Sequence, residues 1–161
     1  MFSISSIFEG IQEKMANMLG LKYIDLPVAY IIENPSSKPV HYKINTFDNL
    51  EEFIIEWKNK RLSPYYKSEP IPSGAGGPIV KIVGKTYSNL IKDGDKDALV
   101  LFTAPWCNHC IEFKKVYEKI AKKIEGAHML FGLIDYSLNE VEGVEITEYP
   151  TIMFYPGRSK K

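Results

Sequence analysis

Two cysteines, the only ones in the chain, form the motif Cys107-Asn108-His109-Cys110. The motif follows a continuous apolar run over residues 98–102 and precedes a long stretch of helical periodicity. Two thiols at this spacing on the first turn of a helix can form a disulfide with each other and exchange it with another protein. The motif is therefore typical of a thiol–disulfide exchange site.

The two cysteines are expected to have different roles because they differ in position. Cys107 should lie at the helix N-terminus, where unpaired N–H groups and the helix dipole favour the thiolate, which is the nucleophilic form. Cys110, one turn further on, should be more buried and can attack a mixed disulfide held at Cys107. His109 lies between them and, as a cation, would favour the thiolate and make the pair more oxidising.

Three other interpretations of the motif stay open. The cysteines could be half of a zinc site, although the sequence holds no second such pair and the other two histidines lie far from the motif. They could be inert core residues, although Pro105, Trp106 and the intervening histidine argue against this. Cys107 could be the nucleophile of a hydrolase, but Cys110 would then have no role. We expect no metal site.

The composition excludes several classes of partner. Twenty basic and twenty acidic side chains balance in a chain of 161 residues, so the net charge is near zero. This balance argues against general binding to nucleic acid or to anionic membranes. No apolar run is long enough to cross a bilayer, and charged residues interrupt the N-terminal apolar stretch, so neither a membrane span nor a signal peptide is expected.

Residues 1–62 are predicted to fold as helix, strand, strand and helix. Apolar residues recur at helical spacing over residues 4–19, and Asp48 with Glu51 has the pattern of a capping box that opens a second helix. Between the helices, residues 28–32 and 41–44 are expected to pair as a hairpin. Residues 63–78 are rich in proline, glycine and serine and are predicted to be a linker.

Residues 79–161 carry the cysteine motif. Strands are expected at 79–83, 98–102, 129–134 and 151–155, and Thr86 is expected to cap a helix between the first two. The run 98–102 is apolar throughout, as in a strand that is buried on both faces of a mostly parallel sheet. The helix after Cys107 should end near residue 126. The residues that this helix is expected to bury are Phe113, Val116, Tyr117, Ile120, Ala121 and Ile124.

Several of these stretches together resemble the protein disulfide-isomerase family. The residues that carry the resemblance are Ala104-Pro105-Trp106 with the motif, Tyr117-Glu118-Lys119, Ile134-Asp135, Tyr149-Pro150-Thr151 and the linker stretch 67–72. The resemblance implies a thioredoxin-like α/β fold with a mixed sheet flanked by helices. It implies the C-terminal half of a non-catalytic, b′-like domain over residues 1–62, and a catalytic domain over 79–161 that lacks its last strand and helix.

The resemblance also implies roles for individual residues. Carried over by position, Cys107 is the attacking cysteine, Cys110 is the resolving cysteine, and Pro150 is a cis-proline that faces them. Trp106, Tyr149 and Pro150 would contact client peptides.

The family resemblance implies the formation, reduction or rearrangement of disulfides in unfolded or misoxidised client proteins of the endoplasmic-reticulum lumen. No cofactor is expected beyond the redox-active cysteine pair, which could exchange with glutathione or with a partner oxidase. A second interpretation is a redox-weak, thioredoxin-fold chaperone that holds its clients.

Five positions depart from the family pattern. Asn108 replaces a glycine of the motif, Leu101 a buried glutamate, Leu133 a lysine, Thr147 an arginine and Lys115 a helix proline. The leucines would replace a buried acid–lysine pair on both sides, which leaves no charge unpaired but removes the carboxylate that accepts the proton of the resolving thiol. We therefore hypothesise that the site keeps its nucleophile but resolves mixed disulfides slowly.

Overall fold

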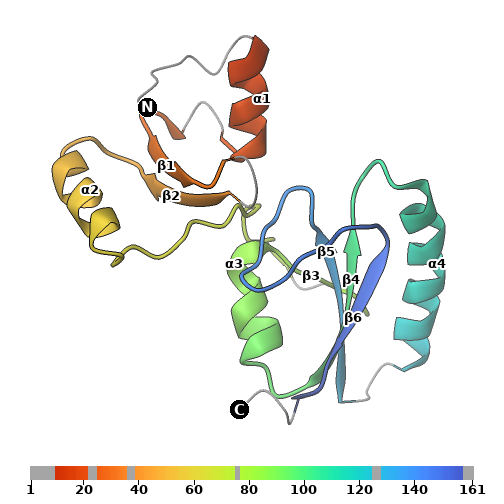
Figure 1. The fold of residues 1–161 in the computed structure, drawn as a ribbon. Helices are drawn as coiled ribbons and strands as arrows, with labels where there is room; N and C mark the ends of the chain where they lie inside the picture. The colour runs from red at the N-terminus through yellow and green to blue at the C-terminus, as the bar shows by residue number, and fades with distance from the viewer. Residues whose placement is uncertain (1–9, 22–24, 36–38, 75–76, 125–127, 158–161) are drawn as a thin grey trace. The chain divides into compact units, whose positions relative to one another are not determined.

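The computed structural model describes residues 10–21, 25–35, 39–74, 77–124 and 128–157 (Figure 1). The chain divides into two compact units, with the boundary between Tyr66 and Lys67. This boundary lies inside the stretch 63–78 that the sequence predicts to be a linker. We describe each unit by itself.

The first unit contains α1 (Gly10–Met18), β1 (Ala29–Glu33), β2 (Val40–Ile44) and α2 (Leu50–Lys58). The order helix, strand, strand, helix is the predicted one, although residues 4–9 of the first predicted helix lie outside the described part. β1 and β2 pair as an antiparallel hairpin, from Ala29 opposite Ile44 to Glu33 opposite Val40. The indole Nε1 of Trp57 donates to Glu33 Oε1 at 2.6 Å, which ties α2 to this hairpin.

The predicted capping box at the start of α2 is wrong. The residue that caps the helix is Asn49, and its side chain makes no capping hydrogen bond. Asp48 instead accepts a hydrogen bond from the Thr46 hydroxyl at 2.9 Å, and its own N–H donates to that hydroxyl at 3.2 Å. A local turn of this kind competes with capping for a short polar side chain.

A four-stranded mixed sheet forms the centre of the second unit. Its strands β3 (Val80–Lys81), β4 (Asp97–Thr103), β5 (Met129–Asp135) and β6 (Thr151–Tyr155) lie in the order β3-β5-β4-β6. β3 and β4 run parallel to β5, and β6 runs antiparallel to β4.

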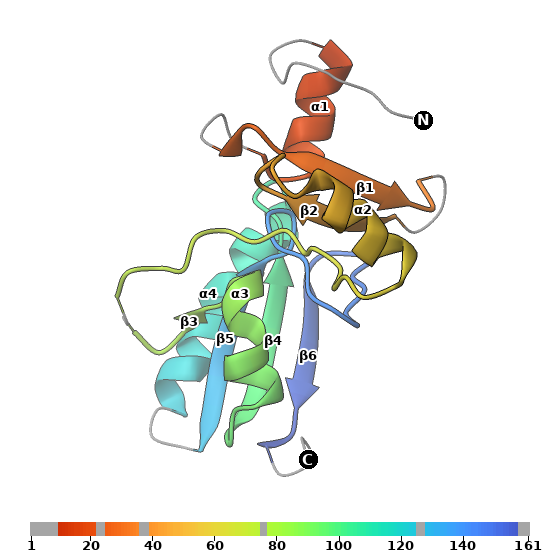
Figure 2. The same ribbon diagram turned by 90° about the vertical axis from the view of Figure 1, so that its left-hand side faces the viewer.

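Helices cover both faces of this sheet. On one face lies α3 (Gly84–Tyr87), which continues as a π-helical segment, Ser88–Lys92, and on the other lies α4 (Asn108–Lys123) (Figures 1 and 2). The predicted α/β fold, a mixed sheet flanked by helices, is confirmed.

β4 supplies the middle of the core. Val100, Leu101 and Phe102 have no exposed surface, so consecutive side chains are buried on both faces of the strand, as its apolar sequence predicts. On the α4 face, the hydroxyl of Tyr117 lies 2.5 Å from Leu99 O and 3.1 Å from Gly132 O. Burial raises the pKa of Tyr117 well above its usual range, so the neutral hydroxyl stays a donor that anchors α4 to the sheet.

Two expectations about the helices of this unit are wrong. α3 begins at Gly84, two residues before the predicted cap Thr86, whose hydroxyl accepts the Val83 N–H at 3.1 Å from inside the helix. In α4, Tyr117 and Ala121 are buried as predicted, but Val116, Ile120 and Ile124 are 50%, 40% and 40% exposed. Val116 and Ile120 each lie about 100° around the helix from the buried residue that follows them, so periodicity alone overestimated the width of the face that meets the sheet. Ile124 is the C-cap residue at the end of the helix.

Residues 67–69 of the predicted linker are hydrogen-bonded into the second unit: Lys67 to Glu140, Ser68 to Lys85, and Glu69 to Asn139, which has no exposed surface. The N–H groups of Glu69 and Gly84 donate to Asn139 Oδ1 at 3.0 and 2.9 Å. Its Nδ2 donates to Glu69 Oε2 at 2.9 Å and to Asp135 O at 2.8 Å. One buried amide therefore joins the stretch before the sheet, the start of α3 and the end of β5.

Asn139→Ala should lower the free energy of unfolding by about 3 kcal/mol, because it leaves buried N–H and carbonyl groups without partners. Urea denaturation of the full chain, followed by tyrosine near-UV circular dichroism, would measure the change. The exposed Asn89→Ala is the matched control and should change stability by less than about 0.5 kcal/mol. Equal midpoints for the two variants would contradict the anchoring role of Asn139.

Candidate active site

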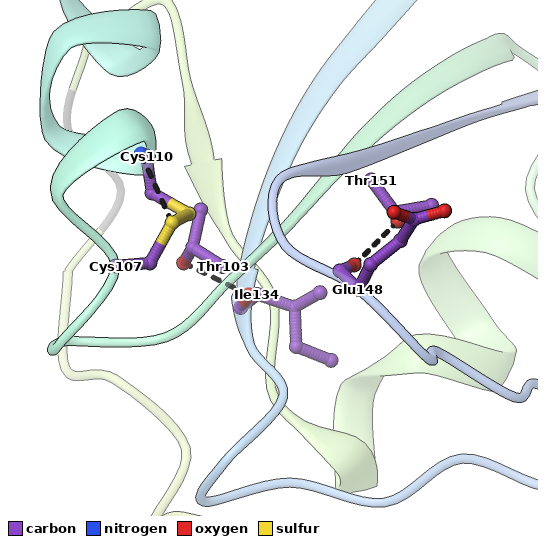
Figure 3. Close-up of a disulfide and its surroundings, with 6 residues drawn as sticks. All are labelled: Thr103, Cys107, Cys110, Ile134, Glu148 and Thr151. Atoms are coloured by element: carbon purple, nitrogen blue, oxygen red, sulfur yellow. Dashed lines mark hydrogen bonds between the residues drawn. A yellow bond between two sulfur atoms is a disulfide. The ribbon is translucent and has the colours of Figure 1, made fainter.

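Cys107 and Cys110 form a disulfide at the first turn of α4, with their Cα atoms 5.2 Å apart (Figure 3). The turn that leads from β4 into the helix is closed by the Cys107 N–H, which donates to Ala104 O at 3.1 Å. Cys107 is the N-cap of α4, and its sulfur accepts the N–H of Cys110 at 3.1 Å. The sulfur thus takes the place that a hydroxyl or carboxylate oxygen usually occupies at a helix start, where negative charge is favoured.

The surroundings of the two sulfurs are unequal. Cys110 is only 3% exposed, whereas Cys107 is half-buried and is flanked by the exposed Asn108 and His109. Trp106 is 68% exposed, so its indole does not pack in the core. An incoming sulfur can therefore approach Cys107 from solvent, while Cys110 faces the interior.

Pro150 lies at the same end of the sheet as the cysteine motif. The Tyr149–Pro150 peptide is cis, as the resemblance implies. It directly precedes Thr151, the first residue of β6, which pairs with Phe102 one residue before the end of β4. The Thr151 hydroxyl donates to Glu148 O at 2.7 Å and closes the turn that carries this peptide (Figure 3).

A pocket of about 630 Å³ opens beside Cys110. It is bounded by the loop before β3, the end of β4, the first turns of α4 and the end of β5. Its ionisable lining residues are Lys81, Lys114, Glu118 and Asp135. The buried member of the cysteine pair therefore opens on one side to a pocket that contains ionisable groups.

Leu101 and Leu133, two of the positions that depart from the family pattern, lie directly opposite each other on β4 and β5. Leu101 has no exposed surface and packs in a cluster with Tyr117, Ala121 and Phe131. Leu133 is half-buried and lines the pocket. The two departures thus form one cross-strand pair, in which two leucine side chains stand where the family has a charged glutamate and lysine.

The sequence analysis gave no role to Thr103 or Asp135, the last residues of β4 and β5. They are paired across the two strands, and both line the pocket with Cys110. The sequence could have indicated both residues, because each directly follows a predicted strand, 98–102 or 129–134. The carboxyl ends of parallel strands meet at one edge of a sheet.

The structure also bears on the other classes of site. Within the described ranges, no group of three or more histidine, cysteine, aspartate or glutamate side chains is placed to hold a metal ion. In the same part of the chain, no helix has the length and apolar character needed to cross a bilayer.

Comparison with known proteins agrees with this geometry. Residues 78–161, just over half of the chain, match the family model described as Thioredoxin. The chain belongs to the thioredoxin family. The match covers the whole sheet and both helices of the second unit.

This thioredoxin-family chain is also similar to longer proteins. It is 35% identical over 148 residues to protein disulfide-isomerase A4 of Homo sapiens, covering 89% of this chain and 23% of that protein. It is 31% identical over 154 residues to protein disulfide isomerase-like 1-4 of Oryza sativa subsp. japonica, covering 94% and 27%. The chain therefore spans about a quarter of the length of these relatives. The crystal structure of the Trx4 domain of ERdj5 aligns with 50% of this chain and 72% of its own, with a TM-score of 0.44 and 23% identity, too low to add to the assignment.

After reduction, Cys107 should react with iodoacetamide at neutral pH at least about 10-fold faster than Cys110, because it is the more exposed thiol and the helix N-terminus favours its thiolate. Mass spectrometry of peptides from timed samples of the full chain would measure both rates. The same reaction in concentrated guanidinium chloride is the control, and there the two rates should converge. Equal rates in the folded chain would contradict the proposed asymmetry.

Proposed function

We propose that the second unit is a thiol–disulfide oxidoreductase and isomerase that acts on disulfides of client proteins. The observation that carries the proposal is the asymmetric pair, in which Cys107 caps α4 beside solvent and Cys110 lies behind it at 3% exposure. Similarity to proteins named protein disulfide-isomerase supports the same activity.

The chemistry proceeds in two exchange steps. In reduction, the Cys107 thiolate attacks one sulfur of a client disulfide, a mixed disulfide forms, and the other client sulfur leaves as a thiolate. Cys110 then loses its proton and attacks Cys107, which forms the Cys107–Cys110 disulfide and releases the second client thiolate. Oxidation of a client dithiol is the reverse sequence. In isomerisation, another client thiolate attacks the client sulfur of the mixed disulfide, which forms a new client disulfide and releases Cys107 as a thiolate.

Client contact is assigned to the surface around Cys107. Trp106 offers an exposed aromatic face before the motif, and His109 is exposed on the first turn of α4. Tyr149 and Pro150 contribute backbone at the edge of β6, where an extended peptide could add main-chain hydrogen bonds. His109, as a cation, would favour the thiolate of Cys107.

The setting and the domain assignment follow the family. Clients would be unfolded or misoxidised proteins of the endoplasmic-reticulum lumen, and glutathione or an oxidase would restore the redox state of the pair. Residues 1–62 are assigned to the C-terminal half of a b′-like domain, 63–78 to the linker and 79–161 to the catalytic domain. The fixing of residues 67–69 to the second unit limits the part of the linker that can move.

A second candidate function is a client-holding module with slow turnover. The facing Leu101 and Leu133 favour it, because neither can take a proton from Cys110. Thr147, which stands where the family has an arginine, is exposed and brings no charge to the cysteine pair. Slow release would lengthen the life of the mixed disulfide at Cys107 and make the chain hold clients longer than a standard family domain does.

Cys110→Ala should accumulate a mixed disulfide with a client, because the sulfur that releases the client is gone while Cys107 remains. The full-length variant would be reduced, incubated with scrambled ribonuclease and quenched with acid. A non-reducing gel would then show an adduct that dithiothreitol removes, at about 10-fold the level seen with the unmodified chain. Cys107→Ser is the matched control and should give none. An adduct with Cys107→Ser, or none with Cys110→Ala, would contradict the assigned roles.

Restoring the acid–lysine pair as Leu101→Glu with Leu133→Lys should speed release of the client by about 10-fold or more, because a carboxylate can then accept the proton of Cys110. Mass spectrometry of acid-quenched samples would measure the release, as loss of the mixed disulfide between Cys107 and a disulfide peptide. The matched control is Leu101→Gln with Leu133→Lys, which has similar size but no basic carboxylate. If the control speeds release equally, or the acidic pair does not speed it, slow resolution is not caused by the leucines.

A further inference from the structure

Release of a client depends on a proton leaving Cys110, a thiol with little access to solvent. Cys110 is 3% exposed, and its open side faces the pocket of about 630 Å³. This volume holds several water molecules, since one occupies about 30 Å³ of liquid. A base that lines this pocket is therefore the nearest route by which the thiol can lose its proton.

Four ionisable side chains line the pocket, and two of them are carboxylates. Glu118 is paired with Lys122 at 3.1 Å and lies eight residues beyond Cys110 on α4. Eight residues of helix span about 12 Å, so Glu118 is distant from the sulfur along the axis. Lysines are protonated at neutral pH and cannot accept the proton, which leaves Asp135.

Asp135 lies at the end of the sheet that carries the cysteines. It is opposite Thr103 in the pairing of β4 with β5, and the loop to Cys107 begins directly after Thr103. Its Oδ1 accepts hydrogen bonds from the N–H and the hydroxyl of Ser137 at 3.0 and 2.5 Å. Among the described residues all its side-chain hydrogen bonds fall on Oδ1, which leaves Oδ2 for water in the pocket.

The negative charge of Asp135 affects Tyr149, at the end of the unit that carries the cysteines. Burial raises the pKa of Tyr149, and the negative charge of Asp135 raises it further, so the carboxylate lies near the residue that precedes Pro150. On the opposite wall, Lys114 is one turn beyond Cys110 and lines the same pocket. Residues four apart lie on one helix face, so its ammonium group can stabilise a thiolate at Cys110.

We propose that Asp135 is the proton acceptor for Cys110 when a client is released. The thiol proton passes to water in the pocket and from it to the Asp135 carboxylate. The Cys110 thiolate attacks the Cys107 sulfur of the mixed disulfide, the Cys107–Cys110 disulfide forms, and the client sulfur leaves as a thiolate. Asp135 afterwards returns the proton to solvent. The inference rests on the proposed function and explains how release proceeds while leucine occupies positions 101 and 133.

The test separates the two exchange steps in a single turnover of the reduced full chain. The substrate is a peptide with one cysteine, activated as a mixed disulfide with thionitrobenzoate. Release of thionitrobenzoate, followed by absorbance, reports the attack by Cys107. Loss of the peptide adduct from acid-quenched samples, followed by mass spectrometry, reports release of the peptide by Cys110. Both phases are measured from pH 6 to pH 9.

Asp135→Asn should slow the second phase at least about 10-fold at pH 7 and leave the first phase within about 2-fold. The difference in second-phase rate between Asp135→Asn and the unmodified chain should shrink to less than about 3-fold at pH 9, because the thiolate fraction of a thiol rises with pH and release then depends less on a base. Asp135→Glu keeps the carboxylate and should stay within about 3-fold of the unmodified chain. Glu118→Gln, the other pocket carboxylate, should change neither phase.

Three results would overturn the inference. One is a second phase in Asp135→Asn at the unmodified rate at pH 7. Another is an equal slowing at every pH, which a purely structural role of Asp135 would produce. The third is an Asp135→Glu variant as slow as Asp135→Asn. An unmodified chain without any first phase would overturn the proposed function itself, and this inference with it.

Discussion

The in-register pairing of β4 with its two neighbours is the constraint on which the site depends. β4 is parallel to β5 over seven residues and antiparallel to β6 over five. Because it is buried on both faces, a shift of one residue would exchange its two core-facing sets of side chains, so the register is strongly specified. This register brings Thr103, Asp135 and Pro150 to one end of the sheet, where the loop to Cys107 begins.

At that end, the helix start makes the two sulfurs chemically different. Cys107 caps α4 and accepts the Cys110 N–H, while Cys110 is turned inward. The N-terminal partial charge acts within the first turn and therefore acts mainly on Cys107. Burial acts mainly on Cys110, which needs a base before it can react. Under the proposed function, one short helical turn thus separates the attacking sulfur from the resolving one.

The hydrocarbon pair Leu101–Leu133 changes where polar chemistry can occur. A buried acid and lysine at these positions would carry charge beneath the cysteines, at the cost of desolvating both. With leucine on both strands, the α4 side of the core is continuous hydrocarbon from Leu101 through Tyr117 to Phe131. The ionisable groups that line the pocket include the half-buried Asp135 and the exposed Lys114. Under the proposed function, this arrangement would favour stability of the unit over speed of the resolving step.

Local sequence pattern predicted helix caps and the buried face of α4 less accurately than it predicted strands. Asp48 and Thr86 both had the residue type of a helix cap, yet Asp48 is engaged by Thr46 and Thr86 lies inside its helix. Val116 and Ile120 fit a helical apolar stripe but are exposed, because the part of α4 that meets the sheet is narrow. The buried role of Asn139 could not be predicted from local sequence pattern, since its four hydrogen bonds join segments up to seventy residues apart.

The sequence by itself determined the elements and the identity of the redox pair. Apolar runs, helical periodicity and the Cys107–Cys110 spacing are local properties of the chain, and they predicted the strands, α4 and the exchange chemistry. Only the tertiary structure decided that Asp135 lines a pocket with Cys110 and that Leu101 faces Leu133. Those facts depend on which strands pair and in which register, and burial of both faces of β4 selects that register across segments far apart in the chain.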